Sequence, residues 1–146
     1  MGEVSRGNGK LGAGFVLLDK STIATGNPLM LALVRSDGLY DIPKGVIENG
    51  ESDLAAAKRE TFEECSVVVR DHEMLFNSIP HKFGRLTTFC AVTGDTPSII
   101  ANPHTGIIEH TGFLWLDIDS FCSNCLEYLI PGVLHFYSLH TNDYNG

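Results

Sequence analysis

The segment that most constrains the fold of this chain runs from Asp53 to Cys65 (DLAAAKRETFEEC). It contains no Gly or Pro, and its Ala run has the highest helix propensity of any residue type. Ser52 stands directly before it, where a side-chain oxygen can accept a hydrogen bond from the first helical turn. The sequence therefore predicts a helix over 53–65 with Ser52 as its N-cap.

Three carboxylates share one face of this predicted helix. Each helical residue turns by about 100°, so Glu60, Glu63 and Glu64 fall within roughly a third of the circumference. The opposite side predicts a packing stripe of Leu54, Phe62 and Cys65, while Ala56 leaves the acidic face uncrowded. One face is expected to pack and the other to do chemistry.

The acidic face needs a counter-charge. Like charges at these spacings repel, and the only cation next to them in sequence is Arg59. Carboxylates at this density suit a hard divalent cation such as Mg²⁺ or Mn²⁺. The alternative for the Glu63-Glu64 pair alone is a solvated acidic helix face.

The spacing of the surrounding residues decides between these alternatives. In order, the positions are Gly45, five residues, Glu51, seven residues, Arg59-Glu60, two residues, Glu63-Glu64, one residue, Ser66 and Val67. This pattern resembles the Nudix box of hydrolases that act on nucleoside diphosphates linked to another group. It departs from that family at Ser66, where the family has a Gly that is often left-handed. A non-Gly residue in that conformation costs on the order of 1 kcal/mol, so the departure concerns the helix end more than the ligand set.

Composition limits the class of protein. At 146 residues and 43% apolar, the chain is long enough for one well-buried domain, which we expect to span 1–146 with flexible ends at 1–9 and 141–146. No stretch has the 18 or so continuous apolar residues of a membrane span, and residues 1–10 lack the apolar core of a signal peptide. We therefore expect a cytoplasmic protein that does not bind membranes.

Charge and cysteine content exclude further classes. The formal net charge of −8 argues against non-specific nucleic-acid binding. A polyphosphate substrate would therefore have to be bound locally, by metal ions and a few basic side chains. Cys122 and Cys125 form a C-x-x-C, but Cys65 and Cys90 lie alone in a predicted helix and strand. Reduced packing cysteines are favoured over a zinc site.

Strand patterns lie on both sides of the helix. β-Branched and aromatic residues predict strands over 11–19, 29–35 and 85–92, with a loop at 21–28. Residues 67–70 are expected to continue as a strand and 72–80 to stay extended. Residues 94–106 predict a long loop of the kind that carries specificity elements.

The last third of the chain predicts one more strand region and two helices. Residues 107–116 predict a strand pair, or one strand kinked at Gly112. A helix is expected over 117–129, capped near Asp117 or Asp119, and Pro131 suits the first turn of a second helix. Strands and helices in this order predict an α/β class sandwich with a mixed β-sheet. The strand order of an α/β/α Nudix fold is implied only by the resemblance.

The resemblance extends beyond the box to one branch of the family. The run Tyr40-Asp41-Ile42-Pro43-Lys44-Gly45, and Glu109-His110 followed by Trp115-Leu116, are similar to the asymmetric dinucleoside tetraphosphate hydrolases. This implies a metal-dependent pyrophosphohydrolase in which water attacks one phosphorus of a substrate such as diadenosine tetraphosphate. Capped RNA 5′ ends and ADP-ribose are alternative substrates of the same chemistry, and a nucleotide-binding sensor without turnover is the alternative of a different class.

The resemblance also implies roles for individual residues. Glu60 and Glu64 are the expected metal ligands, with the Gly45 carbonyl as a backbone ligand. Glu63 is either a third ligand or the general base. Glu109 is the other candidate base, with a surface carboxylate at a strand end as its alternative. Arg59 is expected to pair with Glu51 and brace the loop against the helix.

Candidate substrate contacts are less specific. Lys44 can reach a phosphate, and Lys82 and Arg85 can add positive charge, although a solvated-surface role is the alternative for the latter two. Tyr40 and Phe89 can stack on an adenine or can be core residues. His81 and His110 are candidate contacts of the same kind, and a structural role is the alternative for both.

Overall fold

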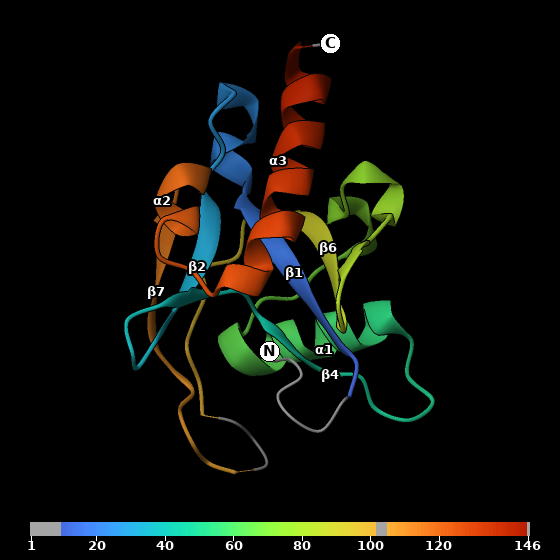
Figure 1. Ribbon diagram of the computed structural model, residues 1–146, viewed down its shortest axis with the longest axis vertical. Coiled ribbons are helices and arrows are strands. Elements are labelled where there is room, and N and C mark those ends of the chain that lie inside the picture. Colours follow the sequence, from blue (N-terminus) through green and yellow to red (C-terminus); the bar gives the residue numbers. More distant parts are fainter. Residues whose placement is uncertain (1–9, 102–104, 146) are drawn as a thin grey trace.

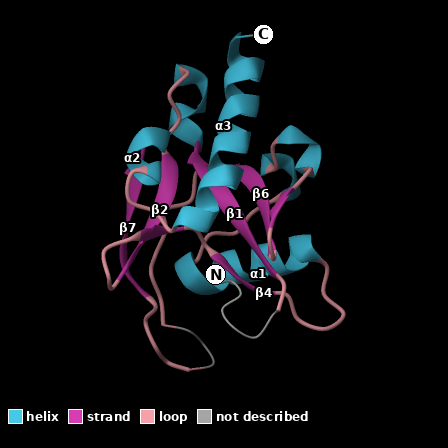
Figure 2. Ribbon diagram, in the orientation of Figure 1, coloured by secondary structure: helices cyan, strands magenta, loops and turns pink. Residues whose placement is uncertain are grey.

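A mixed β-sheet lies between two helical layers in this computed structural model, which describes residues 10–101 and 105–145. Helix α1 covers one face of the sheet, and α2 and α3 cover the other (Figures 1 and 2). The described strands are β1 (Gly12–Asp19), β2 (Met30–Arg35), β3 (Tyr40–Asp41), β4 (Lys44–Val46), β5 (His81–Phe83), β6 (Leu86–Thr93) and β7 (His110–Leu116). The α-helices are α1 (Asp53–Cys65), α2 (Ile118–Cys122) and α3 (Ile130–Asn145). The α/β sandwich expected from the sequence is confirmed.

Strand β1 is the centre of the sheet and explains the two layers. It pairs in parallel with β6 and antiparallel with β2 and β4, while β7 and β3 pair with β2 and β5 pairs with β6. Alternate residues of a strand point to opposite faces. Phe15 and Leu17 therefore belong to the core under α1, and Val16 and Leu18 to the core under α2 and α3.

Helix α1 has the predicted limits, and Leu54 and Cys65 of the predicted stripe pack on the sheet while Phe62 does not. Ser52 caps it by accepting a hydrogen bond from the Ala55 N–H at 3.0 Å. Its buried residues are Ala56, Ala57, Thr61 and Cys65. Phe62, expected on the packing side, is 52% exposed, because the helix turns its small residues to the sheet and carries Phe62 past the edge of the contact.

The segments after α1 differ from the predicted strands. Residues 67–70 form no strand, since the Val68 N–H donates to Asp95 and the Arg70 N–H to Glu73 in place of a neighbouring strand. The expected extended region 72–80 contains the 3₁₀ helices η2 (Asp71–Glu73) and η3 (Phe76–Ser78). Local side-chain acceptors therefore replace the sheet hydrogen bonds that the β-branched residues suggested.

The remaining elements follow the prediction with shorter limits. The loop expected at 21–28 contains the 3₁₀ helix η1 (Lys20–Thr25), and the expected helix 117–129 divides into α2 and the 3₁₀ helix η4 (Glu127–Leu129). It breaks where Cys125 bridges to Tyr40. Residues 107–116 give one strand, which begins at His110 and has an irregular register beside Gly112. Residues 141–145, expected to fray, continue α3, whereas 1–9 and 146 lie outside the described residues.

Other features bear on the class of protein. No helix of the described ranges is long and apolar enough to cross a membrane. Cys65, Cys90, Cys122 and Cys125 are free thiols, and Cys65, Cys90 and Cys125 are buried in the hydrophobic core. Burial raises the pKa of the Cys65 and Cys125 thiols to about 12, which makes both unreactive at neutral pH.

Candidate active site

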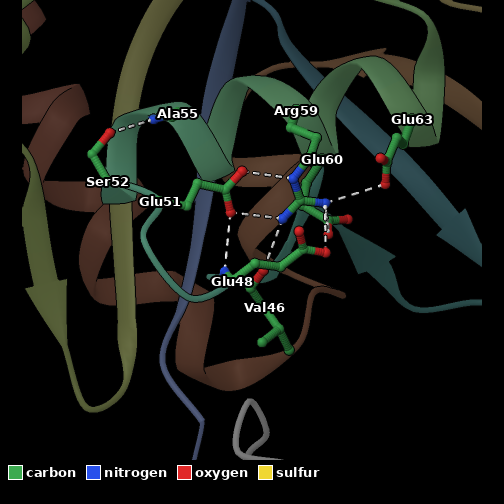
Figure 3. Close-up of polar contacts among 8 residues, drawn as sticks. All are labelled: Val46, Glu48, Glu51, Ser52, Ala55, Arg59, Glu60 and Glu63. Atoms are coloured by element: carbon green, nitrogen blue, oxygen red, sulfur yellow. Dashed lines mark hydrogen bonds and ion pairs between the residues drawn. The ribbon is translucent and has the colours of Figure 1, made fainter.

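Arg59 holds the loop before α1 against the helix (Figure 3). Its Nε and Nη2 donate to the two carboxylate oxygens of Glu51 at 2.8 and 3.0 Å, the pairing expected from the sequence. Nη2 also donates to the Val46 carbonyl, and Nη1 donates to Glu60 at 2.8 Å and to Glu63 at 3.4 Å. The hydrogen bonds to Glu51 are the main cause that raises the pKa of Arg59, and the same hydrogen bonds lower the pKa of Glu51. We call Arg59 with these residues and Glu48 the Arg59 cluster.

Gly45 lies against the carboxylate of Glu60. A Cβ on Gly45 would stand 2.1 Å from the Glu60 Cδ, which no side chain could tolerate without displacing that carboxylate. The Gly of the box is therefore needed for close approach and not for an unusual φ. Burial raises the pKa of Glu60, as do Glu63 and Glu109, while Arg59 lowers it.

Glu64 lies one turn further along the helix. The Lys44 backbone N–H donates to its Oε1 at 3.3 Å. Burial raises the pKa of Glu64 well above its ordinary range, and the negative charges of Asp41, Glu60 and Glu109 add to the shift against the opposing effect of Lys44. A carboxylate in these surroundings gains strongly from a nearby cation.

A second charged cluster lies under the strands. Asp41 is 4% exposed and accepts hydrogen bonds from the Ile42 N–H at 2.8 Å and from Lys44 Nζ at 3.2 Å. His110, 5% exposed, places Nε2 3.3 Å from Asp41 Oδ2. Burial works against ionisation of Asp41, but Lys44 and His110 outweigh it and lower its pKa. We call Asp41, Lys44, His110 and Glu64 the Asp41 cluster.

The acidic residues face one cavity of about 640 Å³, a size typical of small-molecule sites. Of the residues predicted from the sequence, its wall contains Lys44, Gly45, Glu60, Glu64 and Glu109. The other lining residues are Gly12, Arg35, Ser36, Asp41, Val46, Leu86, Ile107, Ile108 and His110. The box helix and the start of β7 thus meet across one space.

Several predicted site residues lie elsewhere. Phe89 is 3% exposed and packs on Phe15, so its assignment to base stacking is wrong. Tyr40 stacks on Phe121 on the α2 side of the sheet, opposite to Asp41, because neighbouring strand residues point to opposite faces. Lys82 and Arg85 lie exposed on the β5–β6 hairpin, outside the cavity wall.

Of the three carboxylates predicted as metal ligands, the structure places two at the cavity. Glu63 turns to Arg59 and is absent from the cavity wall, whereas Glu60 and Glu64 line it. In the described ranges, no three His, Cys, Asp or Glu side chains gather closely enough to hold a metal ion alone. Mg²⁺ is usually bound by one or two carboxylates together with waters and substrate phosphates. The oxygen donors of Glu60 and Glu64 fit that mode, with the Gly45 carbonyl as a predicted third donor.

Sequence reasoning missed part of the wall. The sequence indicates Asp41 only as a motif residue, leaves a structural role open for His110, and predicts Arg35, Ile107 and Ile108 only as strand residues. Ile107 and Ile108 are each 62% exposed, so they offer apolar surface beside the acids. Two consecutive Ile residues directly before Glu109 were the available signal.

Comparison with known proteins gives the family. A model described as "NUDIX domain" matches residues 10–124. A search of curated proteins finds no match. Among solved structures, the fold is similar to a C. elegans Ap4A hydrolase, at 18% identity over 91% of this chain and 98% of that one, with a TM-score of 0.68.

Two further structures show the same likeness. The E. coli dihydroneopterin triphosphate pyrophosphohydrolase has 17% identity over 88% of this chain and 95% of that one, with a TM-score of 0.63. A MutT Nudix hydrolase from Burkholderia pseudomallei has 15% identity over 86% and 95%, with a TM-score of 0.62. The chain therefore belongs to the Nudix family and is a hydrolase that acts on acid anhydrides in phosphorus-containing substrates.

Proposed function

We propose that the protein hydrolyses a phosphoanhydride bond of a nucleoside diphosphate-linked substrate with the help of Mg²⁺ or Mn²⁺. The observation that carries this proposal is the convergence of Glu60, Glu64 and Glu109 on one cavity, where burial and mutual repulsion raise the pKa of the first two. The pKa values of Glu60 and Glu64 are raised although Arg59 and Lys44 oppose the shift, so the ionised forms of both carboxylates gain from a further cation. A divalent cation with a polyphosphate meets that requirement.

The bound cation would supply charge neutralisation of the phosphates and a lower pKa for the attacking water. Glu60 and Glu64 would hold it. Glu109, across the cavity, takes the proton of the water as its oxygen bonds to phosphorus, and the bridging oxygen leaves on the departing phosphate. Glu109 is favoured over Glu63 as this base, because Glu63 is engaged by Arg59 outside the cavity wall.

The residues around the ligands keep them in place. Arg59 joins Val46 of β4 and Glu51 of the following loop to Glu60, which ties the segment before α1 to the helix. Lys44 donates its backbone N–H to Glu64 and turns its ammonium to Asp41. Contact of Lys44 with a substrate phosphate stays a prediction.

A dinucleoside polyphosphate such as diadenosine tetraphosphate is the substrate we favour. The support is the sequence resemblance to that branch and the likeness to the C. elegans Ap4A hydrolase. Ile107 and Ile108 provide apolar surface for a nucleoside beside the acids, and Arg35 provides a cation at the wall. The likeness to a dihydroneopterin triphosphate pyrophosphohydrolase keeps other substrates in view, among them ADP-ribose and capped RNA 5′ ends.

Product analysis tests the proposal. The purified protein is incubated with Mg²⁺, then with Mn²⁺, and with diadenosine tetraphosphate, ADP-ribose, dihydroneopterin triphosphate or capped RNA. We expect metal-dependent products, with diadenosine tetraphosphate cleaved most efficiently. Binding without products from any substrate would favour the nucleotide sensor, and cleavage without metal would refute the role of Glu60 and Glu64. The cytoplasmic location and the single-domain organisation stay predictions.

A further inference from the structure

The start of β7 contains a bulge that determines which way His110 points. Val34 of β2 pairs with Gly112, but the next residue, Arg35, pairs with His110, so Thr111 is an extra residue in the ladder. Such a bulge moves every residue beyond it to the other face of the sheet. Leu33 belongs to the core under α1, and Arg35 shares its face. His110 therefore points to the α1 face, where the cavity lies.

Asp41 reaches the same face from the other side of β2. It pairs with Leu33, whereas its neighbour Tyr40 pairs with Val34 and points to the opposite face. The Asp41 carboxylate and the His110 ring meet at 3.3 Å, both almost fully buried. This contact joins β3 to the first residue of β7, directly after Glu109.

Asp41 also connects to the metal-ligand side of the cavity. It accepts a hydrogen bond from Lys44 Nζ at 3.2 Å, and the Lys44 backbone N–H donates to Glu64. One buried carboxylate thus links His110, the residue directly after Glu109, to the strand that contacts Glu64. Glu109 faces both helix carboxylates closely enough to repel each of them.

We propose that Asp41 and His110 are positioning residues that set Glu109 at a fixed distance from Glu60 and Glu64 across the cavity. The proposal rests on the proposed function, because it acts through Glu109 as the base. A base displaced by about 1 Å can lose on the order of 100-fold in rate. The Asp41–His110 contact is buried and spans three strands, so it can hold Glu109, the residue directly before β7, to that tolerance.

The test compares two His110 variants. His110→Gln keeps a donor that can reach Asp41, whereas His110→Leu removes it. We expect His110→Leu to lower kcat by about 10- to 100-fold with little change in KM, and His110→Gln to recover most of that loss. Thermal unfolding is measured for both, and His72→Gln, at an exposed His outside the cavity, is the matched control.

A double-mutant cycle separates positioning from general damage to the fold. A residue that acts through Glu109 has nothing left to position once Glu109 is Gln, so His110→Leu should cost little further kcat in the Glu109→Gln background. Asp41→Asn is treated in the same way. Equal losses in both backgrounds, or His110→Gln as poor as His110→Leu, would overturn the proposal.

The result also separates this inference from the proposed function. If the unchanged protein forms no metal-dependent products, the proposed function fails. If products form and Glu109→Gln has normal kcat, the hydrolase proposal stands while the positioning role is refuted.

Discussion

The Arg59 cluster and the Asp41 cluster both hold acidic side chains, but they do so in different ways. Arg59 neutralises several carboxylates at the partly exposed junction of a loop and a helix, all within twenty residues of one another in sequence. Asp41 is a buried anion that joins residues from β3, β4 and β7. The first cluster shapes a local segment, and the second sets the distance between segments. Substitutions in the two clusters should therefore fail differently.

Glu64→Gln should have the largest effect on activity. It removes one proposed cation ligand and keeps the shape, so we expect a loss of about 10²- to 10⁴-fold in turnover. Because burial raises the pKa of Glu64, the ionised carboxylate is unfavourable in the metal-free protein, and the neutral amide should leave its melting temperature unchanged or raised. Near-normal turnover would remove Glu64 from the ligand set, and a large drop in melting temperature would contradict the unfavourable charge.

Gly45→Ala tests the residue between the two clusters. The added Cβ would stand 2.1 Å from the Glu60 Cδ, so the carboxylate must move away from the backbone. We expect about a 100-fold loss of turnover and weaker activation in a magnesium titration. Gly94→Ala is the control, since its Cβ would meet only Cδ of the Lys20 side chain, at 3.7 Å. Equal activity of the two variants would show that Glu60 does not need its position against Gly45.

Arg59→Lys separates charge from geometry in the Arg59 cluster. A lysine keeps the positive charge but cannot make the paired contacts with Glu51 together with the bond to the Val46 carbonyl. Groups that orient metal ligands typically contribute 10- to 100-fold, and we expect about a 10-fold loss that higher magnesium partly restores. Arg70→Lys, at an exposed side chain outside the cavity wall that pairs with Glu73 and Asp95, should be near normal. Full activity of Arg59→Lys would reduce its role to charge alone.

These two clusters also show what the sequence could predict. The limits of α1 and the Ser52 cap follow from neighbours in sequence, where helical geometry places each residue, whereas the Arg59–Glu51 pair is what the family resemblance implies. The Asp41–His110 contact depends on strand register, and the bulge at Thr111 reverses the face that simple alternation gives His110. The sequence also does not show which of the neighbours Tyr40 and Asp41 faces the cavity. In the structure, Tyr40 packs on Phe121 and Asp41 lines the cavity.

The pH dependence of stability should distinguish the two proposed cation ligands from the other carboxylates of the two clusters. A carboxyl whose folded pKa is raised binds its proton more tightly in the folded state, so its contribution to stability is lost as pH rises from about 4.3 through the raised pKa. Glu60 and Glu64 have this sign, whereas Asp41 and Glu51, with lowered pKa values, lose their contributions as pH falls. In the presence of EDTA, the melting temperature of the wild type should fall between pH 5 and 8, and it should fall more steeply than that of Glu64→Gln. Saturating Mg²⁺ should make the fall of the wild-type melting temperature with pH less steep, because cation binding requires ionised ligands. Identical wild-type profiles with and without Mg²⁺ would contradict this expectation.

Ser66→Gly should have the smallest effect. Ser66 ends α1 in the left-handed region, at φ 63°, as its place in the family pattern implied. Glycine would relieve about 1 kcal/mol of strain, but it would lose the hydrogen bond from the Ser66 hydroxyl to the Ser98 carbonyl at 3.3 Å, which contributes about 0.5 kcal/mol. Chemical denaturation should therefore show Ser66→Gly more stable than wild type by about 0.5 kcal/mol, and Ser66→Ala less stable by a similar amount, with normal turnover in both. If Ser66→Gly were the less stable variant, the hydroxyl contact would outweigh the strain. The serine would then anchor the long loop after β6 to the end of the box helix.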